Sequence, residues 1–195
     1  HIYTVFGSGE VRIDTTFEPL RDDLPHLPRL GLRLQMPGAF DVFTWYGNGP
    51  GESYVDIQNA VHVGVFGSSV DDLHTPYVRP QENGNHTDVR WAALTDSRGV
   101  GLLAMGDPLL NISAHNYTTE DLHAAEHIDE LPVRDLVELN LDYAQGGIGT
   151  GSCGAGTLPK YHLPCQLTEF SMRLRPLLGT LDGAMQAYRR KTEAI

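Results

Sequence analysis

The sequence predicts a mainly β protein, an antiparallel β-sandwich with one short helix and one C-terminal helix. Most segments show apolar side chains at every second position, and in residues 30–36 this pattern gives four apolar side chains in alternation, from Leu30 to Met36. That period is typical of a strand with one buried face. The 195 residues also include 21 glycines and 12 prolines, a content that favours many turns between short strands.

The strands are expected at regular intervals along the chain. A first hairpin turns at Gly7-Ser-Gly9, and a second turns at residues 96–99, Asp-Ser-Arg-Gly, between two apolar runs. Little helix separates the strands, which favours antiparallel pairing. The expected strands are residues 1–6, 10–18, 30–36, 40–46, 61–65, 89–95, 100–105, 133–143 and 168–174.

Two helices are expected. Thr118 is followed three residues later by Asp121, which resembles a capping box and predicts a short helix over residues 119–128. The tail predicts a second helix from residue 181, because Leu181, Met185 and Tyr188 lie at helical spacing. We therefore divide the chain into a sandwich domain, residues 1–176, and a helical tail, residues 177–195.

Composition excludes some classes of partner. A net charge of −11 argues against nucleic acids and anionic membranes, both of which attract basic surfaces. No apolar run approaches the roughly 20 residues that span a bilayer, and no signal peptide pattern is visible. A cytoplasmic location is expected, while sequons at Asn85, Asn111 and Asn116 leave secretion open. The chain starts inside a strand-like pattern, which suggests missing upstream sequence.

Three motifs of catalytic or cofactor sites are weak here. His123 and His127 frame an inverted zincin pattern, but the predicted helix is short and no third ligand is indicated. Residues 149–154 match the glycine pattern of dinucleotide sites, yet no helix follows to meet a pyrophosphate. Cys153 would need a nearby base, and His162 is close only in sequence, so a reduced, inert thiol is favoured.

Two aromatic residues and the acidic residues leave the sugar chemistry open. Trp45 and Tyr46 could offer a stacking platform for a sugar, but core packing at the end of a strand is the favoured interpretation. A retaining glycosidase needs two carboxylates about 5 Å apart. None of the 25 acidic residues is singled out as such a pair.

Three blocks of sequence resemble one enzyme family. Residues 27–32 read Leu-Pro-Arg-Leu-Gly-Leu, and residues 45–56 read Trp-Tyr-Gly-Asn-Gly-Pro-Gly-Glu-Ser-Tyr-Val-Asp. The irregular segment 73–91 contains Thr-Pro-Tyr-Val and Glu-Asn-Gly. These blocks, with residues 111–113 and 147–149, resemble the C-terminal sandwich of the β-galactosidases of glycoside hydrolase family two, over roughly residues 1–176.

The resemblance implies a non-catalytic part of a larger enzyme. The fold would be the later part of a galactose-mutarotase-like supersandwich, and the enzyme would hydrolyse terminal β-D-galactose residues. The family's catalytic glutamates and metal ligands belong to a separate barrel, so no catalytic or metal residue is carried over to this chain. The resemblance assigns no cofactor here and expects magnesium and sodium in the parent enzyme. The implied partners are the catalytic barrel, the other domains, the galactoside and further copies in a homo-oligomer.

One position departs from the family pattern. Better-known members carry a Gly-Gly-Asp-Asp-Ser-Trp loop whose tryptophan stacks on the sugar, whereas residues 149–154 here read Gly-Thr-Gly-Ser-Cys-Gly. Cys153 aligns with that tryptophan and is the substrate-binding candidate, although a thiol offers no aromatic face. We expect the loop over residues 146–156 to close one wall of the active-site cleft.

Two other functions stay open at this stage. A stand-alone carbohydrate-binding module would use a face around Trp45 and Tyr77. A small subunit of a two-chain β-galactosidase would pair with a separate large subunit. In either case, a sandwich that lacks strands would expose sheet edges, so self-association is expected.

Overall fold

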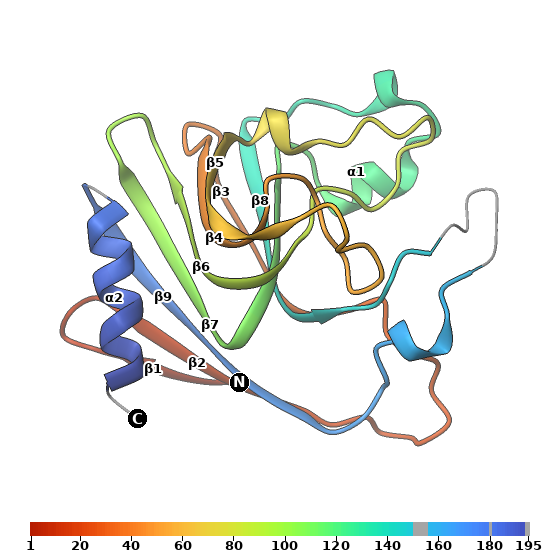
Figure 1. Ribbon diagram of the computed structural model, residues 1–195, viewed down its shortest axis with the longest axis horizontal. Coiled ribbons are helices and arrows are strands. Elements are labelled where there is room, and N and C mark those ends of the chain that lie inside the picture. Colours follow the sequence, from red (N-terminus) through yellow and green to blue (C-terminus); the bar gives the residue numbers. More distant parts are fainter. Residues whose placement is uncertain (150–155, 180, 194–195) are drawn as a thin grey trace.

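The chain folds mainly into antiparallel strands, as the sequence predicts, with a helix at its C-terminal end (Figure 1). The computed structural model describes residues 1–149, 156–179 and 181–193. Its strands are β1 (Ile2–Val5), β2 (Val11–Phe17), β3 (Arg29–Pro37), β4 (Val42–Gly49), β5 (His62–Ser69), β6 (His86–Thr95), β7 (Val100–His115), β8 (Leu136–Gln145) and β9 (Thr168–Leu178). Its α-helices are α1 (Thr119–Ala124) and α2 (Leu181–Glu193), and its 3₁₀ turns are η1 (Asp71–Leu73), η2 (Ile128–Glu130) and η3 (Pro159–Tyr161).

Strand β7 is the centre of the sheet. The main order is β1-β2-β9-β7-β6-β4-β5, and β8 joins at β7 and carries β3. The first half of β7 pairs with β9, from Val100 opposite Leu178 to Asp107 opposite Ser171. Its second half pairs with β8 over residues 111–115. The sheet therefore branches within one 16-residue strand.

The apolar faces of both branches enclose one main core. Alternate residues of β4, β6, β7, β8 and β9 point into it, and the apolar face of β3 covers it from the β8 side. Because burial of apolar area is the main driving force of folding, this alternation fixes the strand registers. Its largest fully buried side chains are Trp45, Phe43, Leu94, Leu110, Ile112, Leu139, Leu141 and Met172.

Helix α2 covers the other face of the sheet. Ala184 and Ala187 pack with Trp91, Leu103 and Met105 in a second apolar cluster. Figure 1 shows the helix lying along β9 and β6 at one side of the sheet. The small alanine side chains bring the helix close enough to bury Trp91 to 1% exposure. The C-terminal helix expected from the spacing of apolar residues is present.

Several expected element lengths were wrong; β5 and β9, for example, each run four residues further than expected, to Ser69 and Leu178. The helix expected over residues 119–128 ends at Ala124, because Ala125 adopts extended backbone and Ile128 begins the separate turn η2. The strand expected over residues 100–105 continues to His115, because its second half finds a new partner in β8. The capping box itself is confirmed, since the Thr118 hydroxyl and the Asp121 carboxylate each accept from the other's backbone amide.

Candidate functional site

The glycine-rich loop after β8 is held at its base by the carboxylate of Asp56. The backbone amide of Ile148 donates to Oδ1 at 3.2 Å, and that of Gly149 donates to Oδ2 at 2.8 Å. Consecutive amides that converge on one anion form a nest, here filled by the chain's own side chain. Bonds to an ionised acceptor are stronger than neutral ones, so this carboxylate defines where the loop begins.

A tight hairpin places Asp56. Tyr54 and Ile57 exchange two backbone hydrogen bonds, of 3.0 and 2.9 Å, which leave Val55 and Asp56 at the tip. The Tyr54 ring is 1% exposed and fixes the hairpin to the body of the domain. Asp56 is the last residue of the block over residues 45–56, so this family block ends on the loop's anchor.

The returning end of the loop is held beside the outgoing end. The Thr157 hydroxyl donates to the Gly147 carbonyl at 2.7 Å, and the Gly147 amide donates to the Tyr161 carbonyl at 2.9 Å. His162 donates through Nε2 to the Thr157 carbonyl at 3.1 Å, and its ring stacks on His26 with centroids 3.9 Å apart. Both ends of the loop are thus fixed to the same place.

Two glycines at this base have no room for a side chain. A Cβ on Gly147 would lie 2.6 Å from Cγ of Asp56, which is inside van der Waals contact. Gly149 has a φ of +61° and would place a Cβ 2.8 Å from the Thr157 backbone nitrogen. Only glycine accepts both the left-handed backbone and the close approach of the segment around Thr157.

The expected contact residue itself lies beyond this base. Cys153, the sugar-stacking candidate, is outside the described residues, as are the other positions from 150 to 155. His162, once considered as its base, is engaged with Thr157 and His26. Cys165 is a free thiol.

The irregular segment 73–91 is joined to the block over residues 45–56 by buried polar contacts. Glu52 accepts from the Tyr77 hydroxyl and, at 2.7 Å, from the Gly84 amide. Ser53 and Asn85 exchange a backbone bond of 2.7 Å and a side-chain bond of 2.7 Å. These contacts make the segment a structural block that supports the hairpin carrying Asp56. The Asn85 side chain is fully buried by them, so this sequon is closed in the folded chain.

A buried ion pair lies beside the start of the loop. Arg29 donates to Oδ2 of Asp142 from Nη2 at 2.5 Å and from Nε at 3.0 Å, and it also pairs with Glu82 at 3.3 Å. The Asp142 side chain is 4% exposed, and this burial raises its pKa to about 6 although Arg29 opposes the rise. The carboxylate is therefore ionised and paired at pH 7, three residues before Gln145 at the end of β8.

The aromatic pair at residues 45–46 offers no sugar platform. Trp45 is 1% exposed, donates to the Asn48 carbonyl at 2.9 Å and stacks on His86 with centroids 4.0 Å apart. Tyr46 packs against Tyr188 of α2 and lies under Arg90. The favoured interpretation of Trp45 as a core residue is confirmed, so Trp45 offers no face to a sugar.

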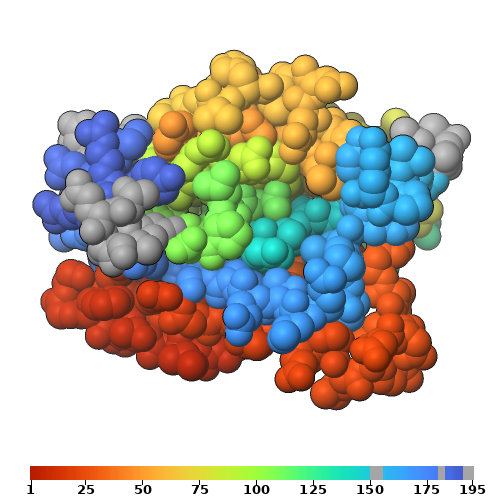
Figure 2. All heavy atoms as spheres, turned by 60° about the horizontal axis from the view of Figure 1, so that its bottom comes forward, coloured from red at the N-terminus to blue at the C-terminus, as the bar shows by residue number. Residues whose placement is uncertain are grey.

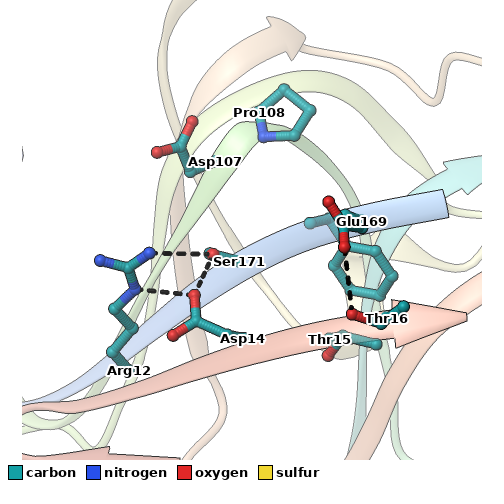
Figure 3. Close-up of a pocket in the computed structure, with 9 residues that line it drawn as sticks. Arg12, Asp14, Thr15, Thr16, Asp107, Pro108, Glu169 and Ser171 are labelled. Carbon is teal, nitrogen blue, oxygen red and sulfur yellow. Dashed lines mark hydrogen bonds and ion pairs between the residues drawn. The ribbon is translucent and has the colours of Figure 1, made fainter. Parts of the chain in front are cut away.

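A polar groove of about 480 Å³ lies between β2, the start of β9 and the part of β7 at Asp107 and Pro108. Figure 2 shows this face, with β2 in red, β9 in blue and β7 in green forming successive bands. Figure 3 shows that two of its carboxylates, those of Asp14 and Glu169, are held by neighbouring side chains. Asp14 accepts from Arg12 and Ser171, and Glu169 accepts from Thr16 at 3.4 Å.

Asp14 in this groove does not have the raised pKa of a glycosidase general acid. The hydrogen bond from Ser171 and the charge of Arg12 hold the pKa of Asp14 below its ordinary value. A general acid in such an enzyme needs a raised pKa.

The described residues show neither a metal centre nor a membrane helix. Among residues 1–149, 156–179 and 181–193, no three His, Cys, Asp or Glu side chains gather so as to hold a metal ion. In the same part of the chain, no helix is long and apolar enough to cross a membrane.

The fold and its anchored loop define a class: a β-rich scaffold domain that presents one fixed loop base. The family profile described as "Beta galactosidase small chain" matches residues 1–174. The chain is 40% identical to a β-galactosidase of Priestia megaterium over 162 residues, which cover 83% of this chain and 16% of that protein. It is 35% identical to a β-galactosidase of Vibrio cholerae over 174 residues, which cover 89% of this chain and 16% of that protein.

This chain belongs to the β-galactosidase small-chain family. It spans about 16% of the length of these curated relatives. A third relative, from Arthrobacter, is 36% identical over 153 residues. Sequence reasoning found the family but missed the roles of Asp56 and of the pair Arg29–Asp142. The position of Asp56 at the end of a family block was the signal available for the first.

Proposed function

We propose that this chain is the non-catalytic sandwich part of a β-galactosidase that removes terminal β-D-galactose residues. Family membership supports the reaction class, and the loop base held by Asp56 supports the role. In the proposed enzyme the loop that starts from this base forms a wall of the active-site cleft, whose catalytic carboxylates come from another part of the enzyme.

The neighbouring parts of the enzyme are the proposed partners of this chain. They are the catalytic barrel and the other domains, whether on the same polypeptide or on a large subunit, and further copies in a homo-oligomer. Magnesium and sodium, where the enzyme requires them, are proposed to bind outside this chain. A cytoplasmic location remains the expectation.

Turnover of a chromogenic β-galactoside tests the proposal. The 195-residue chain alone should give no turnover above a buffer blank. Addition of the catalytic part from the same source should give activity that the catalytic part lacks by itself. Turnover by this chain alone would contradict the non-catalytic role, and full activity of the catalytic part without it would contradict the role in the cleft.

A further inference from the structure

Asp56 connects the structural block of residues 45–56 to the glycine-rich loop. Its two oxygens take separate amides, Ile148 at 3.2 Å and Gly149 at 2.8 Å, so the carboxylate sets both the position and the direction of the backbone. A single acceptor atom would leave the loop free to rotate about one hydrogen bond. The bidentate contact removes that freedom.

The support behind Asp56 is rigid. Its hairpin closes by paired backbone bonds between Tyr54 and Ile57, and the Tyr54 side chain is buried in the domain. Ser53, directly before the hairpin, is fully buried and bonded to Asn85 and Thr87. Few rotamers remain for a carboxylate on so short and fixed a turn, which is what positioning of a remote group requires.

The loop base is matched to Asp56 by its glycines. The backbone of Gly147 passes so close to the carboxylate that a Cβ would meet Cγ at 2.6 Å. The left-handed Gly149 turns its amide toward the same carboxylate. The Thr157 hydroxyl then donates to the Gly147 carbonyl, which ties the returning end of the loop to the end that Asp56 holds.

We propose that Asp56 is a positioning residue for galactoside hydrolysis, which acts by fixing the base of the glycine-rich loop, residues 146–149 and 156–157, beside the active-site cleft of the proposed enzyme. This inference rests on the proposed function. Asp56 touches neither substrate nor reacting atoms in this scheme. Its contribution is to hold the described base of that loop in place, and a displacement of about 1 Å caused by a mutation far from the chemistry can reduce a rate about a hundredfold.

Asp56→Asn is the informative variant, because it is nearly isosteric. The amide keeps one acceptor oxygen and turns an NH₂ donor toward the second backbone amide, so one hydrogen bond is replaced by a contact between two donors. Asp22→Asn is the matched control. It removes the same charge from an exposed carboxylate for which no hydrogen bond is seen within the described residues.

The first measurement is amide hydrogen exchange in the 195-residue chain, followed at Ile148 and Gly149. Asp56→Asn should exchange at these amides about tenfold faster or more than wild type, while Asp22→Asn should match wild type. Unfolding midpoints of both variants should agree, which separates local loosening from global destabilisation. Unchanged exchange at both amides would overturn the inference directly.

The second measurement is steady-state kinetics of the complete enzyme that contains this chain. Asp56→Asn should lower kcat/KM for a chromogenic galactoside about tenfold or more, with a raised KM, whereas Asp22→Asn should have wild-type kinetics. Faster exchange with unchanged kinetics would refute the positioning role and the proposed place of the loop. Unchanged exchange with lowered kinetics would leave the proposed function standing and reject the anchor.

Discussion

Acid should destabilise this domain through His115, a buried and neutral histidine. Its Nε2 lies 3.1 Å from the Asn83 carbonyl, which can only accept, so Nε2 carries the proton of the neutral ring. Its Nδ1 is buried and has no partner within the described residues. Protonation would place a donor there with no acceptor, and burial lowers the pKa of His115 to about 4.

The size of the effect follows from linkage. An unfolded histidine takes up its proton near pH 6.5 and the folded one near pH 4, so between these values the unfolded state binds more protons. Stability is therefore lost as the pH falls through this window, by about 3 kcal/mol for this ring.

Two other buried groups titrate in the same range. His86, with its pKa also lowered by burial to about 4, adds a similar loss of stability. Asp142 acts in the opposite direction, because its raised pKa favours the folded state as the pH falls below about 6.

The variant His115→Gln isolates the contribution. Its side-chain amide can still donate to Asn83, whereas it cannot titrate, and the contributions of His86 and Asp142 remain in both proteins. Urea unfolding followed by the fluorescence of the buried tryptophans, at several pH values from 4 to 7.5, gives both curves. The wild type should lose about 3 kcal/mol more than the variant over this range. Parallel curves would refute the assignment of a buried neutral His115.

Three further changes test the packing, each by urea unfolding. Arg29→Met should cost about 3 kcal/mol or more, because it leaves Asp142 buried and unpaired, and adding Asp142→Leu should recover much of the loss. Trp91→Ala should cost about 3–5 kcal/mol and loosen α2, seen as lost helical circular dichroism before the main transition; a single unchanged transition would contradict the packing. Gly47→Ala should cost about 1–3 kcal/mol because its Cβ would lie 2.7 Å from a β6 side chain, whereas Gly51→Ala has open space and should be neutral.

Most of the fold could be predicted from local patterns. Alternation in β3 located that strand to within a residue, and the Thr118–Asp121 capping box located the start of α1. The end of α1 and the second half of β7 could not be found in this way. Both depend on contacts with residues distant in sequence, and residues 106–108, Gly-Asp-Pro, read locally as the end of a strand.

The candidate site was predictable only in part. The family blocks directed attention to the loop after β8, but spacing alone could not show that Asp56 meets Gly149, because 93 residues separate them. The same limit applies to Arg29 and Asp142, which lie on neighbouring strands 113 residues apart. Trp45 was correctly placed in the core because a tryptophan on an alternating strand has one buried face.

The pairing of β2 with β9 has a consequence for synthesis on the ribosome. Arg12 and Ser171 are 159 residues apart, so the hairpin of β1 and β2 leaves the ribosome long before its sheet partner exists. During that interval the hydrogen-bonding edge of β2 has no strand to pair with, and Ile13 lacks its apolar cover. Such edges attract other nascent chains. The edge of β2 thus stays unpaired until β9 has been made, and slow elongation between these two strands should lower the yield of folded chain.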